Sequence, residues 1–388
     1  MTGEESPLMP TYPPPPVTFV RGAGSRLYDD EGRSYLDFVG GLAVTSLGHS
    51  HPAVADALAA QSRTLLHVSN LYGTTVATEV ARVLDRLLGA GPGQLFFCNS
   101  GAEANECAIK LARKWAGEGR YAVISAHRSF HGRTLATLHA TGQPLKHAAF
   151  QPLPEGFHHV PYGDLDALAA ALEAPDVAAV LLEPVQGEGG VFVAPPGYLQ
   201  GARRLCDERS ALLMMDEVQT GLGRTGRWFG FQHSGIRPDV VTMAKALGNG
   251  VPIGACWARA EVSAAFVPGD HATTFGGQPL ATAAARAVLA VMEAEDVPGR
   301  AERAGRRLRA GLEAMPAVVG VRGQGLLLAA ELRDRPAAEV ARAALGAGLL
   351  VNAVTPTAVR VAPSLLVTDE EVDEALGILD GILSEVAA

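Results

Sequence analysis

The sequence predicts an α/β fold, with a mostly parallel sheet flanked by helices and a smaller α+β domain formed from both chain termini. From about residue 99 onward, short apolar runs alternate with stretches of helical spacing, which is typical of βαβ units. The clearest runs cover residues 121–125, 177–182, 211–215 and 240–244. From about residue 285 the chain becomes Ala- and Arg-rich, with strand-like stretches at 325–331 and 358–362. We therefore expect an N-terminal segment joining the small domain (1–45), a large domain (46–285) and a C-terminal small domain (286–388).

The N-terminal segment is expected to add strands to the small domain. Four prolines at 13–16 form a stiff, extended lead-in that cannot be helical. Residues 25–38 then read as two short strands joined by an acidic turn that contains Gly32.

Composition indicates a large, soluble enzyme. The 388 residues are 48% hydrophobic and 19% charged, with a net charge of −9 and a pI near 5.7. An acidic chain argues against binding to nucleic acid or to an anionic membrane, and no apolar run approaches the roughly 20 residues of a membrane span. We see no secretory signal, no CxxC pair and no disulfide framework. We therefore expect a cytoplasmic protein with free thiols and without a metal site.

Lys245 is the most informative residue. It is one of few lysines in the chain, an apolar run precedes it, and a glycine-rich turn follows it. Burial at the end of a strand favours the neutral, nucleophilic amine. Such an amine can form a Schiff base with an aldehyde cofactor. The alternative interpretation is a solvated surface lysine.

Two acids and one helix start accompany this lysine. Asp216 ends a predicted buried strand, where a carboxylate is costly unless it is paired. Residues 99–106 open a helix directly after another apolar run, with Ser100 as the cap. The free N–H groups of Gly101 and Ala102 could cradle a phosphate, or the segment could be a well-capped helix and nothing more. Glu188 projects from a glycine-rich loop at a further strand end, and its alternative is a solvated acid.

Other side chains could complete a pocket. Phe130 could stack on a flat cofactor ring, and Arg133 could grip a carboxylate, although a core phenylalanine and a surface arginine are the plain alternatives. Thr274 offers a hydroxyl beside a glycine turn. Arg360 stands in an apolar strand, an unusual position for a cation without a carboxylate partner.

Together these features call for a phosphorylated aldehyde that carries a basic aromatic ring, and pyridoxal phosphate fits each requirement. Lys245 would bind it, and Asp216 would keep the pyridine nitrogen protonated so that the ring can accept electrons. Gly101, Ala102 and Thr274 would hold the phosphate.

Residues 221–226 match the pattern G-x-G-x-x-G, which would suit a nicotinamide-dependent dehydrogenase. We discount the match because a dinucleotide-binding loop opens a helix directly after its strand. Here Glu217 to Thr220 intervene, and residues 227–229 do not read as a helix start.

Taken in order, these motifs resemble the class III aminotransferases, a family of fold type I pyridoxal-phosphate enzymes, over nearly the whole chain. Within that class the chain is most similar to the subgroup that acts on N2-acetylornithine. The motifs that carry the resemblance lie at 99–106, 130–133, 183–190, 216–221, 238–250 and 274–277, with 322–327 and 360–365 for the subgroup.

The resemblance implies roles around the cofactor. Lys245 would be both the Schiff-base lysine and the acid/base that moves the substrate proton. Gln219 would hydrogen-bond the phenolic oxygen of the cofactor. Val218 and Phe130 would pack on the two faces of its ring.

The resemblance also implies how two substrates share one pocket. Arg133 would bind the carboxylate at the amino-acid end of N2-acetylornithine, and Arg360 would bind 2-oxoglutarate. Glu188 would neutralise Arg360 while the amine donor is bound. The implied assembly is a homodimer with active sites at its interface, where Thr273 and Thr274 reach across, Thr274 to the partner's phosphate. Tyr12 is a further candidate for substrate binding.

The implied reaction moves the terminal amino group of N2-acetylornithine to 2-oxoglutarate. Close alternatives keep the chemistry but use ornithine, succinylornithine, 4-aminobutyrate or an aminoadipate-semialdehyde pathway substrate. A decarboxylase or aminomutase of the same family, a dehydrogenase and a catalytically dead scaffold are the remaining alternatives.

Overall fold

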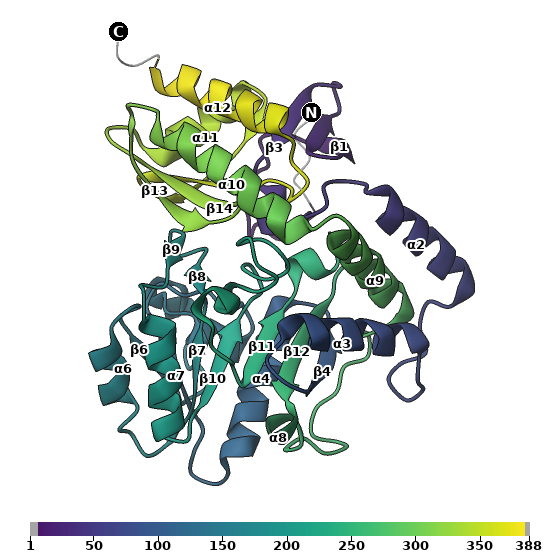
Figure 1. Cartoon of the computed structure of the whole chain (residues 1–388), viewed down its shortest axis with the longest axis vertical. Coiled ribbons are helices and arrows are strands. Elements are labelled where there is room, and N and C mark those ends of the chain that lie inside the picture. Colours follow the sequence, from purple (N-terminus) through teal and green to yellow (C-terminus); the bar gives the residue numbers. More distant parts are fainter. Residues whose placement is uncertain (1–6, 385–388) are drawn as a thin grey trace.

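Two lobes make up the molecule (Figure 1). The computed structural model describes residues 7–384. The larger lobe contains a seven-stranded sheet, and the smaller lobe lies above it in Figure 1 and contains the last helices of the chain.

The seven-stranded sheet is mostly parallel, as the sequence predicts. Strands β10, β11, β7, β5 and β6 run parallel, whereas β12 is antiparallel to both of its neighbours. In spatial order the strands are β4 (Gly93–Cys98), β12 (Gly254–Arg259), β11 (Val240–Met243), β10 (Leu212–Asp216), β7 (Val177–Leu182), β5 (Ala122–Ala126) and β6 (Phe157–Val160).

Both faces of this sheet are buried, because its strands are apolar on both sides. On β10, Leu212 and Met214 pack in one cluster with the helix that follows β4, while Leu213 and Met215 pack in a second, larger cluster. Helices on the first face are α4 (Gly101–Ala116), α5 (Leu135–Ala140) and α8 (Ala260–Ser263). The larger cluster includes residues of α3 (Thr75–Leu88), α6 (Leu165–Ala171), α7 (Tyr198–Glu208) and α9 (Pro279–Ala294), and α2 (Pro52–Thr64) packs on α9.

The smaller lobe is built around an antiparallel sheet. Its strands, in spatial order, are β13 (Val318–Gln324), β14 (Leu327–Leu332), β17 (Ala358–Val361) and β16 (Asn352–Thr355). The helices α10 (Val297–Glu313), α11 (Ala337–Gly346) and α12 (Asp369–Ser384) pack around it. This agrees with the α+β pattern of the C-terminal sequence.

The N-terminal strands join the end of the chain. They are β1 (Phe19–Ala23), β2 (Arg26–Asp29) and β3 (Ser34–Asp37), of which the last two confirm the pair predicted at 25–38. β3 pairs in parallel with β15 (Leu349–Leu350), with Leu36 opposite Leu349. Residues from opposite ends of the sequence therefore complete one sheet.

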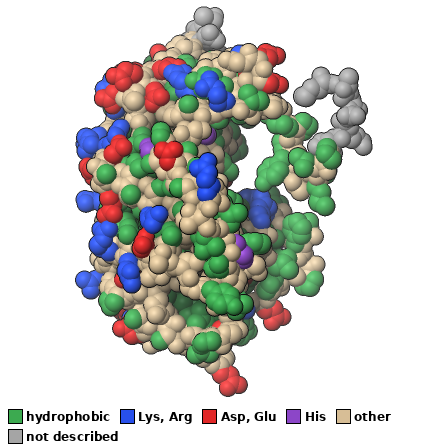
Figure 2. Space-filling view, turned by 90° about the vertical axis from the view of Figure 1, so that its right-hand side faces the viewer, with side chains coloured by type: hydrophobic (Ala, Val, Ile, Leu, Met, Phe, Trp, Pro, Cys, Tyr) green, Lys and Arg blue, Asp and Glu red, His purple; other side chains and the backbone are tan. Residues whose placement is uncertain are grey.

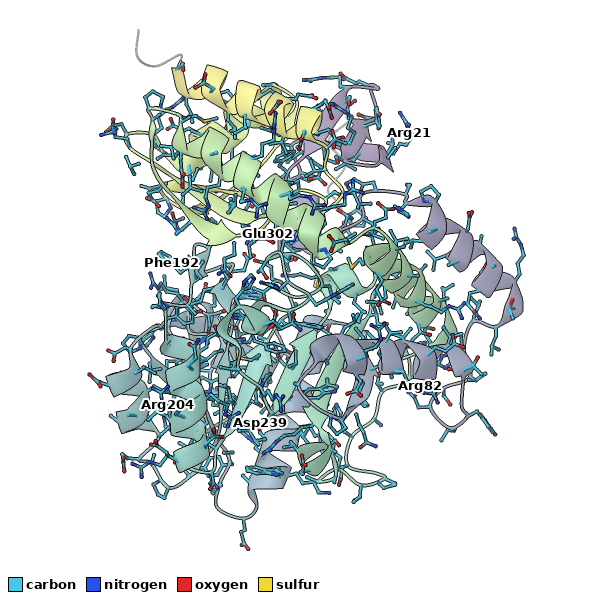
Figure 3. The ribbon with its side chains drawn as sticks, in the orientation of Figure 1. Arg21, Arg82, Phe192, Arg204, Asp239 and Glu302 are labelled. Carbon is cyan, nitrogen blue, oxygen red and sulfur yellow. The ribbon has the colours of Figure 1, made fainter. Side chains whose placement is uncertain are left out.

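Side chains tie the two lobes together. Arg224, from the loop after β10, is 1% exposed, and its Nη1 donates to the carbonyl oxygens of Leu326 at 3.1 Å and Pro363 at 2.6 Å. Phe192, in β9 (Phe192–Val193), lies between the lobes in Figure 3. The guanidinium carbons of Arg128 and Arg322 stand 4.5 and 4.6 Å from the centre of its ring.

No helix among residues 7–384 has the length and apolarity needed to cross a membrane. The Ala-rich tract at 281–290 is helical in α9, and most of the Ala-rich tract at 167–174 lies in α6. The connecting segments include α1 (Gly40–Ala43) and β8 (Val185–Gln186), which pairs with β9.

Candidate functional site

A cavity of about 390 Å³ lies at the edge of the large sheet where β7, β10 and β11 end. Ligands of open α/β sheets bind at the carboxyl ends of the strands. Ten of the residues predicted from the sequence line this cavity: Ser100, Gly101, Ala102, Phe130, Arg133, Glu188, Asp216, Val218, Gln219 and Lys245.

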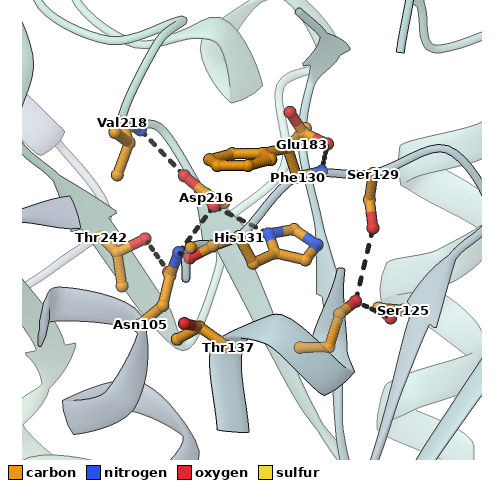
Figure 4. A network of polar contacts seen from close by, with 12 residues as sticks. Asn105, Ser125, Ser129, Phe130, His131, Thr137, Glu183, Asp216, Val218 and Thr242 are labelled. Atoms are coloured by element: carbon orange, nitrogen blue, oxygen red, sulfur yellow. Dashed lines mark hydrogen bonds and ion pairs between the residues drawn. The ribbon is translucent and has the colours of Figure 1, made fainter. Parts of the chain in front are cut away.

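Asp216 is the centre of a buried hydrogen-bond network (Figure 4). The side chain is 4% exposed. Its Oδ2 accepts from Asn105 Nδ2 at 2.8 Å and lies 2.8 Å from His131 Nδ1, and its Oδ1 accepts from the backbone N–H of Val218 at 3.0 Å. These donors compensate the cost of burying a carboxylate and fix its orientation toward the cavity.

Asn105 itself is held from two sides. Its Oδ1 accepts a hydrogen bond from Thr242 Oγ1 at 2.7 Å, and its Nδ2 also donates to the carbonyl oxygen of His131 at 2.8 Å. The Nε2 atom of His131 is buried and has no hydrogen-bond partner in the described part of the chain. The position of Asp216 is therefore set by α4, by β11 and by the loop after β5.

Lys245 follows β11 after one intervening residue, Ala244, and begins a 3-10 turn that spans Lys245–Leu247. Its φ angle of 42° lies in the left-handed region, which is strained for a lysine. Burial lowers the pKa of the Lys245 amine, and Arg360 adds to this effect while Glu188 opposes it. The environment therefore raises the neutral fraction of the amine at a given pH, which is the direction that the sequence predicts.

The N-terminus of α4 opens onto the cavity. Ser100 caps the helix, because its Oγ accepts from the backbone N–H of Glu103 at 3.2 Å. The N–H groups of Gly101 and Ala102 have no partner within residues 7–384. A Cβ atom on Gly101 would lie 2.7 Å from Val218 Cγ1, so only glycine lets the helix approach Val218 this closely. Free N–H groups and the helix dipole suit a phosphate here.

Arg360 has the carboxylate partner that its apolar strand lacks. Its Nη1 lies 2.6 Å from Glu188 Oε1, and it also approaches Gln219 Oε1 at 3.4 Å. Burial raises the pKa of Glu188, but Arg360, together with Lys245 and Gln219, outweighs burial, so the net pKa is lowered. Arg360 is 1% exposed and its Nη2 has no partner in the described structure. One buried cation thus keeps unused hydrogen-bonding capacity.

Four predicted residues do not line this cavity within the single chain: Arg360, Thr273, Thr274 and Tyr12. Arg360 reaches it only through Glu188 and Gln219. Thr274 lines a separate cavity of about 280 Å³ with residues of the segment 67–78, and Thr273 Oγ1 accepts from the N–H of Gly276. Tyr12 is 85% exposed.

The cavity residues that received no role from the sequence include Asn105, His131 and Glu183. Glu183 is 7% exposed and accepts from the N–H of Phe130 at 3.2 Å. Burial raises its pKa well above the usual value, and Asp216 adds to this shift. The position of Glu183 after a buried strand was visible in the sequence, as was the interruption of the apolar face of α4 by Asn105. Neither feature predicts which residue forms the hydrogen bond.

The glycine-rich segment 221–226 does not form a dinucleotide-binding loop. Residues 217–229 contain turns, and the first helical element after them is a 3-10 turn at Gly230–Ser234. The strand–loop–helix geometry that a dehydrogenase needs is missing here.

Comparison with known families identifies the architecture. A model of the family "Aminotransferase class-III" matches residues 9–383. The chain belongs to the class III aminotransferases. A relative from Gloeobacter violaceus, named acetylornithine aminotransferase, is 52% identical over 391 residues, which cover 98% of this chain and 97% of the relative.

Solved structures of aminotransferases have the same fold. The N-acetylornithine aminotransferase from Stenotrophomonas maltophilia is 37% identical, with a TM-score of 0.84 and coverage of 97% of each chain. An ornithine aminotransferase from Toxoplasma gondii, described with partial occupancy of pyridoxal phosphate at its active site, is 36% identical with a TM-score of 0.92. The alignment covers 98% of this chain and 92% of that one. This confirms the predicted fold type and aminotransferase class.

Proposed function

We propose that this enzyme transfers the terminal amino group of N2-acetylornithine to 2-oxoglutarate, giving N-acetylglutamate 5-semialdehyde and glutamate. The observation that carries the proposal is the convergence, in one cavity, of a lysine with a lowered pKa, a fixed buried carboxylate, a helix N-terminus and an exposed arginine. These are Lys245, Asp216, the first turn of α4 and Arg133.

Pyridoxal phosphate is the cofactor, and the cavity residues fit its chemistry. The N–H groups of Gly101 and Ala102, which have no hydrogen-bond partner in the described structure, suit the phosphate. Phe130 and Val218 supply apolar surfaces for a flat ring. The Asp216 carboxylate suits a cationic ring nitrogen. When bound, the cofactor supplies an electrophilic aldehyde and a ring that withdraws electrons from the amine-bearing carbon of the substrate.

Lys245 would supply both the nucleophilic amine and the proton carrier. In its neutral form, Nζ would be the nucleophile that holds an aldehyde cofactor. With substrate bound, Nζ would also carry the proton that leaves the amine-bearing carbon of the substrate. Asp216 would lie beside the ring nitrogen, and its contacts with Asn105, His131 and the N–H of Val218 would hold it in that orientation.

Arg133, Glu188 and Arg360 would let one pocket serve two substrates of different shape. With the amine donor bound, Arg133 would hold the distant carboxylate, and the Glu188–Arg360 pair would remain closed at the 2.6 Å seen here. With 2-oxoglutarate bound, Glu188 would move aside so that Arg360 could bind the α-carboxylate through its unpartnered Nη2.

We further propose a homodimer whose active sites lie at the interface. Large apolar side chains are exposed on the segment 65–72 and at Phe275, which is 57% exposed. Hydrophobic side chains gather on part of the face in Figure 2, which views the molecule from the side where α2 and α3 lie. Exposed large apolar side chains of this kind favour a protein partner, and Thr274, the neighbour of Phe275, would then reach the phosphate of the partner subunit.

The proposal includes the domain division, the cellular location and the pathway that we expect from the sequence. The three-part division into 1–45, 46–285 and 286–388, a cytoplasmic location and a role in arginine synthesis all accord with it. Tyr12 stays a candidate for substrate binding that a second subunit would have to bring near the site.

A panel of amine donors with 2-oxoglutarate tests the function. We expect the highest kcat/KM with N2-acetylornithine, because its blocked α-nitrogen leaves one amine to react. Ornithine is the principal rival, since ornithine aminotransferases share the fold at 36% identity. A kcat/KM higher for ornithine, or absent turnover of N2-acetylornithine, would contradict the proposal.

A further inference from the structure

Glu188 lies in the turn of a two-stranded hairpin that packs on the smaller lobe. Strands β8 and β9 pair in antiparallel fashion, with Gln186 opposite Phe192, and residues 187–191 connect them. Val191, in this turn, is 0% exposed and packs in a cluster with residues of β14 and β17. The hairpin therefore rests on the same sheet whose strand β17 carries Arg360.

The backbone of this turn is strained. Val191 has a φ angle of 60°, in the left-handed region, which is costly for a β-branched residue. At Gly190 a Cβ atom would lie 2.6 Å from Cε2 of Phe192, so the turn folds tightly against the aromatic ring. Strain of this kind persists only where the surrounding structure imposes the conformation. The contacts of Phe192 are the contacts that could impose it.

Two arginines stand against the ring of Phe192, which lies between the lobes in Figure 3. Arg128, shortly after β5, belongs to the larger lobe, and Arg322, in β13, belongs to the smaller lobe. Their guanidinium carbons approach the ring centre to 4.5 and 4.6 Å. Arg322 also donates through Nε to the carbonyl oxygen of Gly190, and its Nη1 lies 2.6 Å from Glu331 Oε2. We call Arg128, Phe192 and Arg322 the Phe192 clamp.

The position of the turn decides whether Arg360 is covered. Both the side chain of Glu188 and the main chain of the turn contact this arginine, because its Nη1 lies 2.6 Å from Glu188 Oε1 and 3.2 Å from the carbonyl oxygen of Gly187. A displacement of the turn by about 1 Å would lengthen both contacts beyond hydrogen-bonding range. The neutralisation of Arg360 therefore depends on how firmly the turn is held.

We propose that the Phe192 clamp determines donor specificity, because it fixes the turn that carries Glu188 over Arg360. Phe192 acts through Glu188 and is thus a positioning residue. The inference rests on the proposed function, in which the pair stays closed while a donor with a terminal amine is bound. A loosened turn would leave Arg360 uncovered for more of the time. The uncovered cation would favour substrates with a carboxylate next to the reacting carbon, such as 2-oxoglutarate, over N2-acetylornithine.

The experiment measures kcat/KM of the holoenzyme for N2-acetylornithine and for 2-oxoglutarate, since each value reports one half-reaction. Phe192→Leu should lower kcat/KM for N2-acetylornithine about fivefold, and should leave the value for 2-oxoglutarate within about twofold or raise it. Phe192→Tyr, which keeps the ring, should resemble the wild type. Phe19→Leu is the matched control, because it removes another half-buried ring, in β1 and outside the cavity, and it should change neither value.

A double-mutant cycle tests whether Phe192 acts through Glu188. Glu188→Gln should shift the donor-to-acceptor ratio of kcat/KM in the same direction. In that background Phe192→Leu should change the ratio less than about twofold. Additive effects, an equal fall for both substrates, or no change in the ratio for Phe192→Leu alone would each overturn the role of the clamp.

Hydrogen–deuterium exchange separates failure of the clamp from failure of the proposed function, because it requires no substrate. Backbone amides of residues 187–193 should exchange faster in Phe192→Leu than in the wild type, and unchanged exchange would contradict the clamp. A wild type that does not use N2-acetylornithine would refute the proposed function alone. The same cycle would then be measured with ornithine, which also has a terminal amine.

Discussion

Lys245 shows how a single residue acquires its chemistry from its surroundings. It stands at the end of a strand in a left-handed backbone conformation, and burial lowers the pKa of its amine. A surface lysine such as Lys114 instead makes an ion pair with Asp270. The position of a lysine in the fold therefore decides whether its amine serves as a nucleophile or as a surface charge. The reactivity of each lysine can be measured separately.

Replacement of the lysine tests its central role. Lys245→Ala should lower transamination at least about a thousandfold, because both the nucleophile and the proton carrier are removed. Turnover is measured with N2-acetylornithine, and circular dichroism shows whether the fold persists. Lys114→Ala should retain activity. Normal turnover by Lys245→Ala would refute the mechanism.

The lowered pKa of Lys245 can be read directly in the protein freed of cofactor. Its pKa lies below the ordinary value of 10.5, so its neutral fraction becomes appreciable at a lower pH than that of a solvated lysine. Reductive methylation with formaldehyde, followed by mass spectrometry across a pH series, should therefore label Lys245 at lower pH than Lys114. Labelling of both residues with the same pH dependence would contradict the shift.

Arg133 lines the cavity without an acidic partner, so its charge is available to substrate. Arg133→Ala should raise the KM for N2-acetylornithine about tenfold or more, because a charge-assisted contact to the carboxylate is lost. Steady-state kinetics measures this, with Arg204→Ala on α7 as a control outside the cavity. An unchanged KM would remove Arg133 from the binding site.

At the level of elements, α4 both offers its N-terminus as a site for the phosphate and holds the buried polar network in place. Its first turn faces the cavity, while Asn105, one turn further, contacts Asp216, His131 and Thr242. The helix thus aligns the strand ends of β10 and β11 with its own N-terminus.

This arrangement predicts a stability effect. Asn105→Ala should lower the free energy of unfolding of the cofactor-free protein by about 1–3 kcal/mol, since buried groups lose their partners. That loss exceeds the gain of well under 1 kcal/mol from the better helix propensity of alanine. Urea denaturation measures the change, and Lys114→Ala on the same helix is the exposed control. An unaltered unfolding midpoint would show that the network is dispensable.

Sequence patterns predicted the elements well because each depends on local residues. The strand before Asp216, the cap at Ser100 and the helix that begins at Gly101 were all visible as local periodicity or capping chemistry. Contacts between distant segments were not. The partner of Arg360 is Glu188, 172 positions away, and the pairing became an expectation only through family resemblance. The roles of Asn105 and His131 likewise depend on three segments meeting, which no local pattern records.

At the level of the whole molecule, Arg224 is a buried cation that joins the lobes without a carboxylate. Its Nη1 contacts two carbonyl oxygens of the smaller lobe, and its Nη2 approaches Ser46 Oγ at 3.4 Å. Burial, with Arg360 nearby, lowers the pKa of Arg224 to about 9. Hydrogen bonds to the carbonyl groups at the lobe boundary, which would otherwise lack a donor, offset the free-energy cost of burying this guanidinium.

Arg224→Met should therefore destabilise the protein by about 2–4 kcal/mol, because the methionine leaves buried carbonyl oxygens unpaired. Thermal unfolding measures the loss, and Arg227→Met, at an exposed position in the same loop, should change the unfolding temperature little. An increase in stability would mean that the charge costs more than its hydrogen bonds return.

The parallel pairing of β3 with β15 bears on how the polypeptide is made. Leu36 leaves the ribosome early, but its neighbour Leu349 is translated near the end. During nearly the whole of synthesis, the leading strands have an edge without its final partner, and such edges favour aggregation. Nascent chains halted before residue 349 should consequently be bound by chaperones at this edge, whereas the finished chain should release them.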